Sequence, residues 1–160
     1  MTLRELQELL DEQAENIEVR QDDDGNFVIT NSLIVRRPFS RPLPGNIVGV
    51  YGNVTCHTGV SLDLGRCLSV GGSIECDMGV RLNLCNCQSV GGRILCCEGA
   101  NLNLSSCQSV GGYVECCEGA SLDLSNCRHV DGAVCCYSNA YLHLGSCQCM
   151  GKTYTTGHFI

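Results

Sequence analysis

Apolar and polar residues alternate along most of this chain, and the alternation recurs with a period of 20 residues. From residue 49 to residue 148 the chain consists of five consecutive units, GVYGNVTCHTGVSLDLGRCL, SVGGSIECDMGVRLNLCNCQ, SVGGRILCCEGANLNLSSCQ, SVGGYVECCEGASLDLSNCR and HVDGAVCCYSNAYLHLGSCQ. A fixed period near 20 residues is typical of a solenoid, in which each unit forms one coil. We number the positions of each unit from 1 to 20, starting at Gly49.

Two segments of each unit carry a strand pattern. Positions 2, 4, 6 and 8 are nearly constant and alternate with variable residues, which predicts one half-buried strand. Leucines at positions 14 and 16 of every unit predict a second strand, and glycine or asparagine at position 11 supplies the turn between them. No helical spacing occurs within the unit. We therefore predict an all-β solenoid (β-helix) of five to six 20-residue coils, in which equivalent residues stack into ladders.

The cysteines follow the same repeat. Ten of the fifteen fall at positions 8 and 19, in line with the leucine and valine positions. Cysteine is a small and readily buried hydrophobe, so we predict that these ten pack a narrow core as reduced thiols in a cytoplasmic protein. Ladders of five cannot pair off completely into disulfides. The Cys-x-x-Cys spacing of structural zinc sites is absent, and we expect no metal and no cofactor.

Residues 1–48 precede the units and predict a small α+β cap with a linker. Thr2 and Glu5 form a capping box, and apolar residues at helical spacing predict a helix across residues 3–17. We expect this helix to pack over the end of the solenoid; the alternative is a helix that pairs with a partner. Short strands are predicted at residues 17–20 and 27–30.

An Asp-Gly turn joins these two strands into a predicted hairpin, and residues 33–35 predict a third short strand. The segment 36–45 then contains all three prolines of the chain, with three arginines around Phe39. Proline removes a hydrogen-bond donor from a strand, so this segment is predicted to be a linker or to protect a sheet edge. Its positive charge also makes it a modest candidate for a contact site.

Residues 149–160 begin a sixth unit and form a predicted C-terminal cap. Met150 takes position 2 and Tyr154 takes position 6 of this unit. A thin cap leaves strand edges able to associate, so we predict Tyr154 and Phe159 as end-to-end contacts. A homodimer through the C-terminal ends is one expected result.

The period and the leucine segments resemble two known families. Pentapeptide-repeat proteins also have 20-residue coils, and residues 100–104 (ANLNL) and 120–124 (ASLDL) resemble their five-residue blocks. Their pattern would place positions 7 and 9 inside, whereas the constant residues here are at positions 6 and 8. The Leu-x-Leu-x-x-Cys segment resembles bacterial leucine-rich repeats, with glycine or asparagine at position 11 where those repeats have leucine. Both resemblances imply a solenoid.

The constant positions are predicted to be interior, so function is assigned to variable positions that face outward. Exposed aromatic and apolar side chains mark interaction sites. In the later units they occur together with glutamates, and we predict an acidic, tyrosine-bearing surface that binds a protein. The candidate partner-binding residues are Leu95, Tyr113, Glu115, Glu118, Tyr137 and Tyr141. Alternatively, the N-terminal hairpin or the C-terminal tail covers this surface.

Charge and motifs narrow the function classes. The formal charge is −7 and no basic stripe occurs, so we expect no direct nucleic-acid binding. No apolar run reaches the length of about 18 residues that a membrane helix requires, and the N-terminus lacks an export pattern, so we expect no membrane association. The four histidines fall at unrelated positions, and no nucleophile has an assigned base. We therefore expect that the chain is not an enzyme.

These observations lead to two functional hypotheses. The first is a non-enzymatic protein-binding module. The short acidic chain is similar to small phage or mobile-element proteins, and this analogy favours an inhibitor of a host defence or nucleic-acid-processing complex that mimics the charge of DNA, as pentapeptide-repeat proteins do. The alternative is a structural protomer that stacks end to end into filaments.

Overall fold

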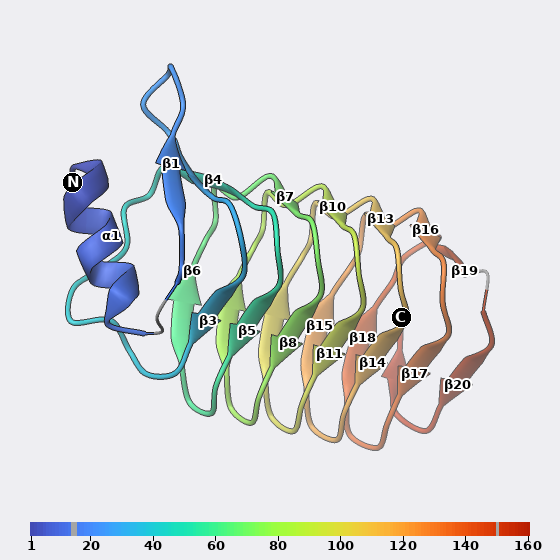
Figure 1. The fold of residues 1–160 in the computed structure, drawn as a ribbon. Coiled ribbons are helices and arrows are strands. Elements are labelled where there is room, and N and C mark those ends of the chain that lie inside the picture. Colours follow the sequence, from blue (N-terminus) through green and yellow to red (C-terminus); the bar gives the residue numbers. More distant parts are fainter. Residues whose placement is uncertain (14–15, 150) are drawn as a thin grey trace.

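The computed structural model describes residues 1–13, 16–149 and 151–160. It is a right-angled stack of short strands wound into a rod, with one helix at the N-terminal end (Figure 1). The strands form three sheets, and all neighbouring strands are parallel except β1 and β2. The predicted β-solenoid with 20-residue coils and a small N-terminal cap is therefore confirmed.

Each sheet contains one strand from each successive coil. Sheet A contains, in spatial order, β1 (Val19–Gln21), β2 (Phe27–Ile29), β4 (Ile47–Val50), β7 (Ser69–Val70), β10 (Ser89–Val90), β13 (Ser109–Val110), β16 (His129–Val130) and β19 (Gln148–Cys149). Sheet B contains β3 (Leu33–Val35), β5 (Val54–Cys56), β8 (Ile74–Cys76), β11 (Ile94–Cys96), β14 (Val114–Cys116), β17 (Val134–Cys136) and β20 (Thr153–Thr155). Sheet C contains β6 (Ser61–Asp63), β9 (Arg81–Asn83), β12 (Asn101–Asn103), β15 (Ser121–Asp123), β18 (Tyr141–His143) and β21 (His158–Phe159).

A coil thus has three strands, at positions 1–2, 6–8 and 13–15, where the sequence predicted two. The predicted strand over positions 2–8 is divided by a bend that contains the constant glycine of position 4. At this bend successive coils approach closely: a Cβ added to Gly112 would lie 2.7 Å from the backbone nitrogen of Arg93. Glycine is required here because any side chain would collide with the backbone of the coil before it.

The interior consists of ladders of identical or similar side chains. Positions 2, 6, 8, 12, 14 and 16 are buried in all five units, as is the cysteine of position 19 in the first four. Adjacent coils pair in register, for example Leu102 with Leu82 and Leu122, so each side chain packs on its equivalent. The cysteines at positions 8 and 19 are packing groups, as predicted, and all fifteen thiols are free.

Two kinds of polar position hold the turns. The residue at position 11 has a positive φ in every unit, between 58° and 74°, which explains the glycines and the single Asn139 found there. At position 15, Asp or Asn accepts a hydrogen bond from the backbone N–H two residues later, as Asp63 does from Gly65 at 2.9 Å. The polar ladder of position 15 therefore has a structural role that the sequence did not reveal.

The N-terminal residues cap the rod and also extend two of its sheets. The capping box of Thr2 and Glu5 starts α1 (Leu3–Asp11), and Leu6 and Leu10 join the core of the solenoid. The helix ends six residues before the predicted limit. Ile17 is buried, as its apolar character requires, but from the segment that leads into β1. The predicted hairpin is β1–β2, and β2 and β3 continue sheets A and B.

The last coil contradicts the register expected from the sequence. Cys149 pairs with Val130 and Thr153 pairs with Val134, so Cys149 takes position 2 and Thr153 takes position 6. Tyr154 therefore takes position 7 and faces outward, with 56% of its surface exposed. A shift of one residue moves every side chain to the other side of a strand. Met150, predicted at position 2, is outside the described residues.

We predict that the protein loses stability at high pH. Burial raises the pKa of Cys56, of Cys67 and of Cys107 to about 12. Above the ordinary pKa of about 8.5 these thiols ionise in the unfolded chain but stay protonated in the folded one, so the free energy of unfolding falls by about 1.4 kcal/mol per pH unit for each thiol. Urea unfolding at pH 8.5 and 10.5 measures this loss. Cys67→Ala should reduce the slope by one thiol's share, and equal midpoints at the two pH values would contradict the prediction.

Candidate functional site

The outer face of sheet B is the surface where most of the predicted binding residues meet. Positions 6 and 8 point into the core, so positions 5, 7 and 9 point outward, and parallel pairing stacks each of these into a column. We call the outward residues of β8, β11, β14, β17 and β20, with their position 5 and 9 neighbours, the sheet B face. Its central column, at position 7, contains Glu75, Leu95, Glu115, Cys135 and Tyr154.

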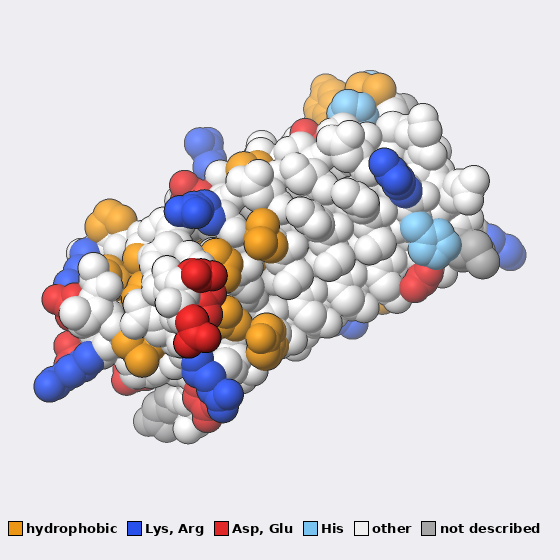
Figure 2. All heavy atoms as spheres, turned by 90° about the horizontal axis from the view of Figure 1, so that it is seen from above, with side chains coloured by type: hydrophobic (Ala, Val, Ile, Leu, Met, Phe, Trp, Pro, Cys, Tyr) orange, Lys and Arg blue, Asp and Glu red, His pale blue; other side chains and the backbone are white. Residues whose placement is uncertain are grey.

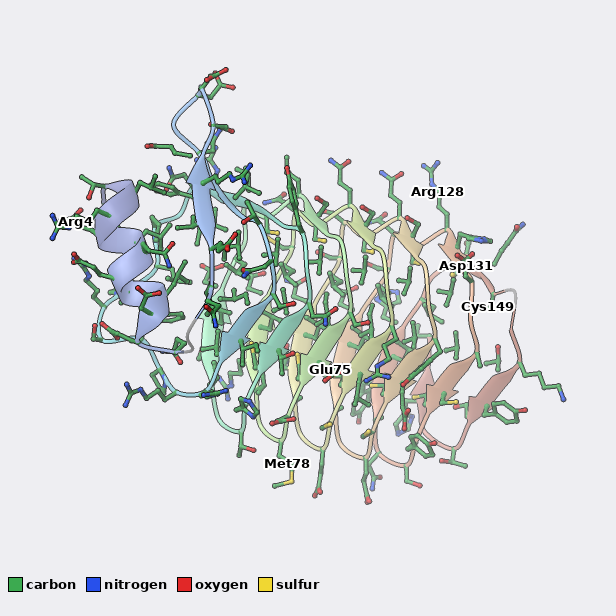
Figure 3. The ribbon with its side chains drawn as sticks, viewed as in Figure 1. Arg4, Glu75, Met78, Arg128, Asp131 and Cys149 are labelled. Atoms are coloured by element: carbon green, nitrogen blue, oxygen red, sulfur yellow. The ribbon has the colours of Figure 1, made fainter. Side chains whose placement is uncertain are left out.

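One end of this face is organised by Arg93, which the sequence did not single out. Its guanidinium forms an ion pair with Glu75, which projects outward from β8 (Figure 3). The same guanidinium lies 5.6 Å from the centre of the Tyr113 ring, within the range of a cation–π contact. Glu75 raises the pKa of Arg93, and the pairing removes one negative charge from the predicted acidic surface. The repeat register would have placed Arg93 here, at position 5 beside Tyr113.

Tyr137 occupies the other end of the face. It lies at position 9 of the fifth coil, with 46% of its surface exposed. The carboxylate of Glu115, one coil earlier, disfavours the phenolate and raises the pKa of Tyr137. The phenol and the carboxylate therefore share one small region of the surface, while Tyr113, at 37% exposure, lies nearer Arg93.

The remaining predicted residues are divided among three places. Leu95 is half-buried in the central column, where it pairs with Glu75 and Glu115 on either side. Glu118 is exposed in the turn that leads from sheet B to sheet C. Tyr141 lies on sheet C, around this corner, and its ring stacks on His158 with centroids 4.9 Å apart.

The two predicted end-contact residues also separate. Tyr154 belongs to the central column of the sheet B face, because it pairs with Cys135. The backbone of Phe159 lies in β21 of sheet C, and its side chain is outside the described residues. The surface seen from above, where the strands of sheet A lie, has few charged side chains in its middle (Figure 2). The sheet B face differs from it by its charges and tyrosines.

Position 9 brings together residue types that are found in hydrolase active sites, but in an unsuitable order. Along this column His57 is followed by Asp77, Cys97 and Cys117, each on the next coil. His57 Nδ1 lies 2.9 Å from the Asp77 carboxylate. Catalysis requires the histidine between the nucleophile and the acid. Here the acid lies in the middle, and coils spaced by about 4.8 Å separate His57 from Cys97 by roughly 10 Å.

The thiols of this column are poor nucleophiles. Partial burial and the nearby Asp77 raise the pKa of Cys97, and partial burial with the neighbouring Cys97 and Glu115 raises that of Cys117 to about 11. Only the thiolate attacks, so both groups are almost entirely unreactive at neutral pH. The chemistry of the sheet B face is therefore that of recognition: carboxylates, phenols and one guanidinium on a rigid surface.

No group of three or more His, Cys, Asp or Glu side chains within residues 1–13, 16–149 and 151–160 is arranged to hold a metal ion. The only helix in the described part of the chain, α1, is too short to cross a membrane. Comparisons of the chain with protein-family models, with curated proteins and with solved structures find no match.

The pairing of Glu115 with Tyr137 can be tested by titration. We predict that Tyr137 ionises at a higher pH than an ordinary tyrosine, and that Glu115→Gln lowers its pKa by removing the negative charge. The ultraviolet absorbance of phenolate, measured for the native chain minus a Tyr137→Phe variant, isolates this residue from the other four tyrosines. The same subtraction with Tyr51→Phe is the control, and it should not respond to Glu115→Gln. An unchanged Tyr137 titration in Glu115→Gln would show that the two side chains are not neighbours.

Proposed function

We propose that this chain is a non-enzymatic protein-binding module and that the sheet B face is its binding surface. The observation that carries the proposal is the convergence of Tyr113, Tyr137 and Tyr154 with two glutamates on one flat sheet. Tyrosine combines a large apolar ring with a polar tip and loses little conformational entropy on binding, so it is enriched in the centres of interfaces. The ladder core below holds these side chains in place before binding, which reduces the entropy lost on association.

The charge of the face favours a basic partner. Glu75, Asp77 and Glu115 face outward from the strands or directly after them, and the exposed Glu98 and Glu118 border the face at the turn to sheet C. Arg93 offsets one of these charges through its ion pair. A surface of this sign accelerates association with a positive patch and repels acidic ones.

Proteins that bind nucleic acids are the class of partner with the largest positive patches. A rigid row of carboxylates would compete with phosphates for the lysines and arginines of such a patch. We therefore propose inhibition of a nucleic-acid-processing or defence complex as the activity of this module. It requires that partner binding be weakened by salt and prevented by DNA.

The proposal predicts that two tyrosines are required for capture. The double variant Tyr113→Ala, Tyr137→Ala should weaken retention of the partner by about tenfold or more, because buried tyrosines contribute about 2 kcal/mol each at interface centres. Affinity capture under reducing conditions, with mass spectrometry of the retained proteins, identifies the partner, and biosensor binding then measures the change. The control is Tyr51→Ala, which removes an exposed tyrosine from the first coil. The melting temperatures of all three proteins should agree. Equal capture by the double variant and the control would sink the proposal.

The alternative, end-to-end association, is supported by the last strands of the sheets. Beyond β19, β20 and β21 no further strand pairs among the described residues, and Thr153 and Thr155 at the end of sheet B are exposed. Head-to-tail filaments need a second open end, whereas α1 packs across the first coil through Leu6 and Leu10. The form of this alternative that we propose is a pair of chains joined through their C-terminal ends.

Sedimentation velocity distinguishes the two forms of association. A C-terminal pair gives a monomer–dimer equilibrium of the 17.2 kDa chain that stops at the dimer as concentration rises. Thr155→Pro should shift it to monomer, because proline removes a donor from the end strand of sheet B. The matched control is Thr58→Pro in the exposed turn of the first coil. Growth beyond the dimer would support filaments instead, and a monomer at all concentrations would exclude both.

A further inference from the structure

Sheet C begins one strand later than the other two sheets at the N-terminal end of the rod. β2 precedes β4 in sheet A and β3 precedes β5 in sheet B, but no strand of the described chain precedes β6 in sheet C. β3 pairs with β5 at an offset of 21 residues. The same offset places residues 40–42 opposite β6. These residues belong to the proline-rich segment 36–45.

The proline-rich segment is attached to the helix and forms no strand with β6. The Glu12 carboxylate accepts a hydrogen bond from the Ser40 hydroxyl at 2.6 Å, and the Arg41 guanidinium donates to the Glu5 carbonyl at 3.2 Å. Pro42 has no N–H to give to a sheet. The segment therefore passes β6 at a distance that its attachment to α1 sets.

The first strand of sheet C keeps an unpaired edge as a result. In each later coil the N–H of position 13 donates to the position 12 carbonyl of the preceding coil. The donors are Arg81, Asn101, Ser121, Tyr141 and His158. Ser61, the position 13 residue of β6, has no such backbone partner in the described part of the chain. Parallel pairing uses the N–H and C=O of alternate residues, so Ser61 and Asp63 both direct these groups toward the missing strand.

A cavity of about 620 Å³ lies between this edge and the proline-rich segment. Phe39, Leu43 and Ile47 give it an apolar wall, and the two are packed against the core from the segment side. Arg41 and Arg66 also line it. The Asp63 carboxylate is already engaged by the Gly65 N–H and by Asn83, both at 2.9 Å. The free charge of the cavity is therefore positive, in contrast to the rest of the chain.

We propose that this cavity is a second binding site, which accepts an extended peptide segment of a partner protein as an added strand of sheet C. Main-chain groups of the peptide bond to Ser61 and Asp63, one side chain contacts the apolar wall, and an acidic side chain pairs with Arg41 or Arg66. Strand addition at a sheet edge takes its affinity from the main chain and its specificity from alternate side chains. The site lies at the first coil and does not depend on the sheet B face.

The test uses two capped hexapeptides, Ac-Thr-Val-Glu-Val-Glu-Thr-NH₂ and the same sequence with lysine in place of both glutamates. Each is titrated into the ¹⁵N-labelled full chain and followed by amide chemical shifts. We expect the glutamate peptide to shift the amides of Ser61, Asp63 and Gly65, and to bind about tenfold more tightly than the lysine peptide. Arg66→Glu should reverse that preference.

N-methylation separates strand addition from contact by side chains alone. Methylating alternate peptide nitrogens removes donors from one edge only, so one methylated set should lose about tenfold in affinity while the other binds nearly unchanged. The peptides carry the backbone change, so the folding of the protein is not at risk. The proposal is overturned if neither peptide shifts the β6 amides at millimolar concentration, if both methylated sets bind equally well, or if the shifts appear on the sheet B face.

Discussion

The structure depends on one constraint: successive coils stack in register at the spacing of hydrogen-bonded strands, about 4.8 Å. At this spacing a side chain at any position touches the same position in the next coil. The interior must then be filled by residues that pack on copies of themselves, which explains the leucines of positions 14 and 16 and the cysteines of positions 8 and 19. At the bend, the same stacking leaves no room for a side chain, and glycine occupies position 4 of every unit.

Because stacking makes the interior repetitive, the sequence predicted the fold well and the site only in part. The interior positions, the turn at position 11, the capping box and the hairpin are all local patterns, and the structure confirms them. The division of positions 2–8 into two strands was not predicted, since a period of two continues through a bend when a glycine occupies it. The sixth coil was misplaced for a different reason. Its register depends on which residues pair with the fifth coil, and Cys149 and Met150 are both apolar enough for position 2.

That single shift also changes the candidate site. It moves Tyr154 from a predicted end contact to the central column of the sheet B face. Which residues interact across the face is likewise a matter of columns. Arg93 reaches Glu75 and Tyr113 because positions 5 and 7 of adjacent coils are neighbours. The column of His57, Asp77 and Cys97 fixes an order that suits an ion pair and does not suit a catalytic triad. In a solenoid, therefore, the outward residues are assigned to neighbours by position number more than by distance along the chain.

The same rule explains why the two proposed sites recognise different features of a partner. Within the regular coils every main-chain group of the sheets is used by the next coil, so only side chains remain for binding, and the sheet B face is a side-chain surface. Main-chain groups become available only where the repeat is interrupted. At the N-terminal end, β2 and β3 complete the preceding coil in two sheets, and the prolines with the Glu12–Ser40 attachment stop it in the third. Proline there prevents the edge of β6 from being filled by its own chain, and the cavity keeps that edge accessible to an extended peptide. A segment that protects a sheet edge by standing away from it therefore also defines the shape and the charge of what can pair with it.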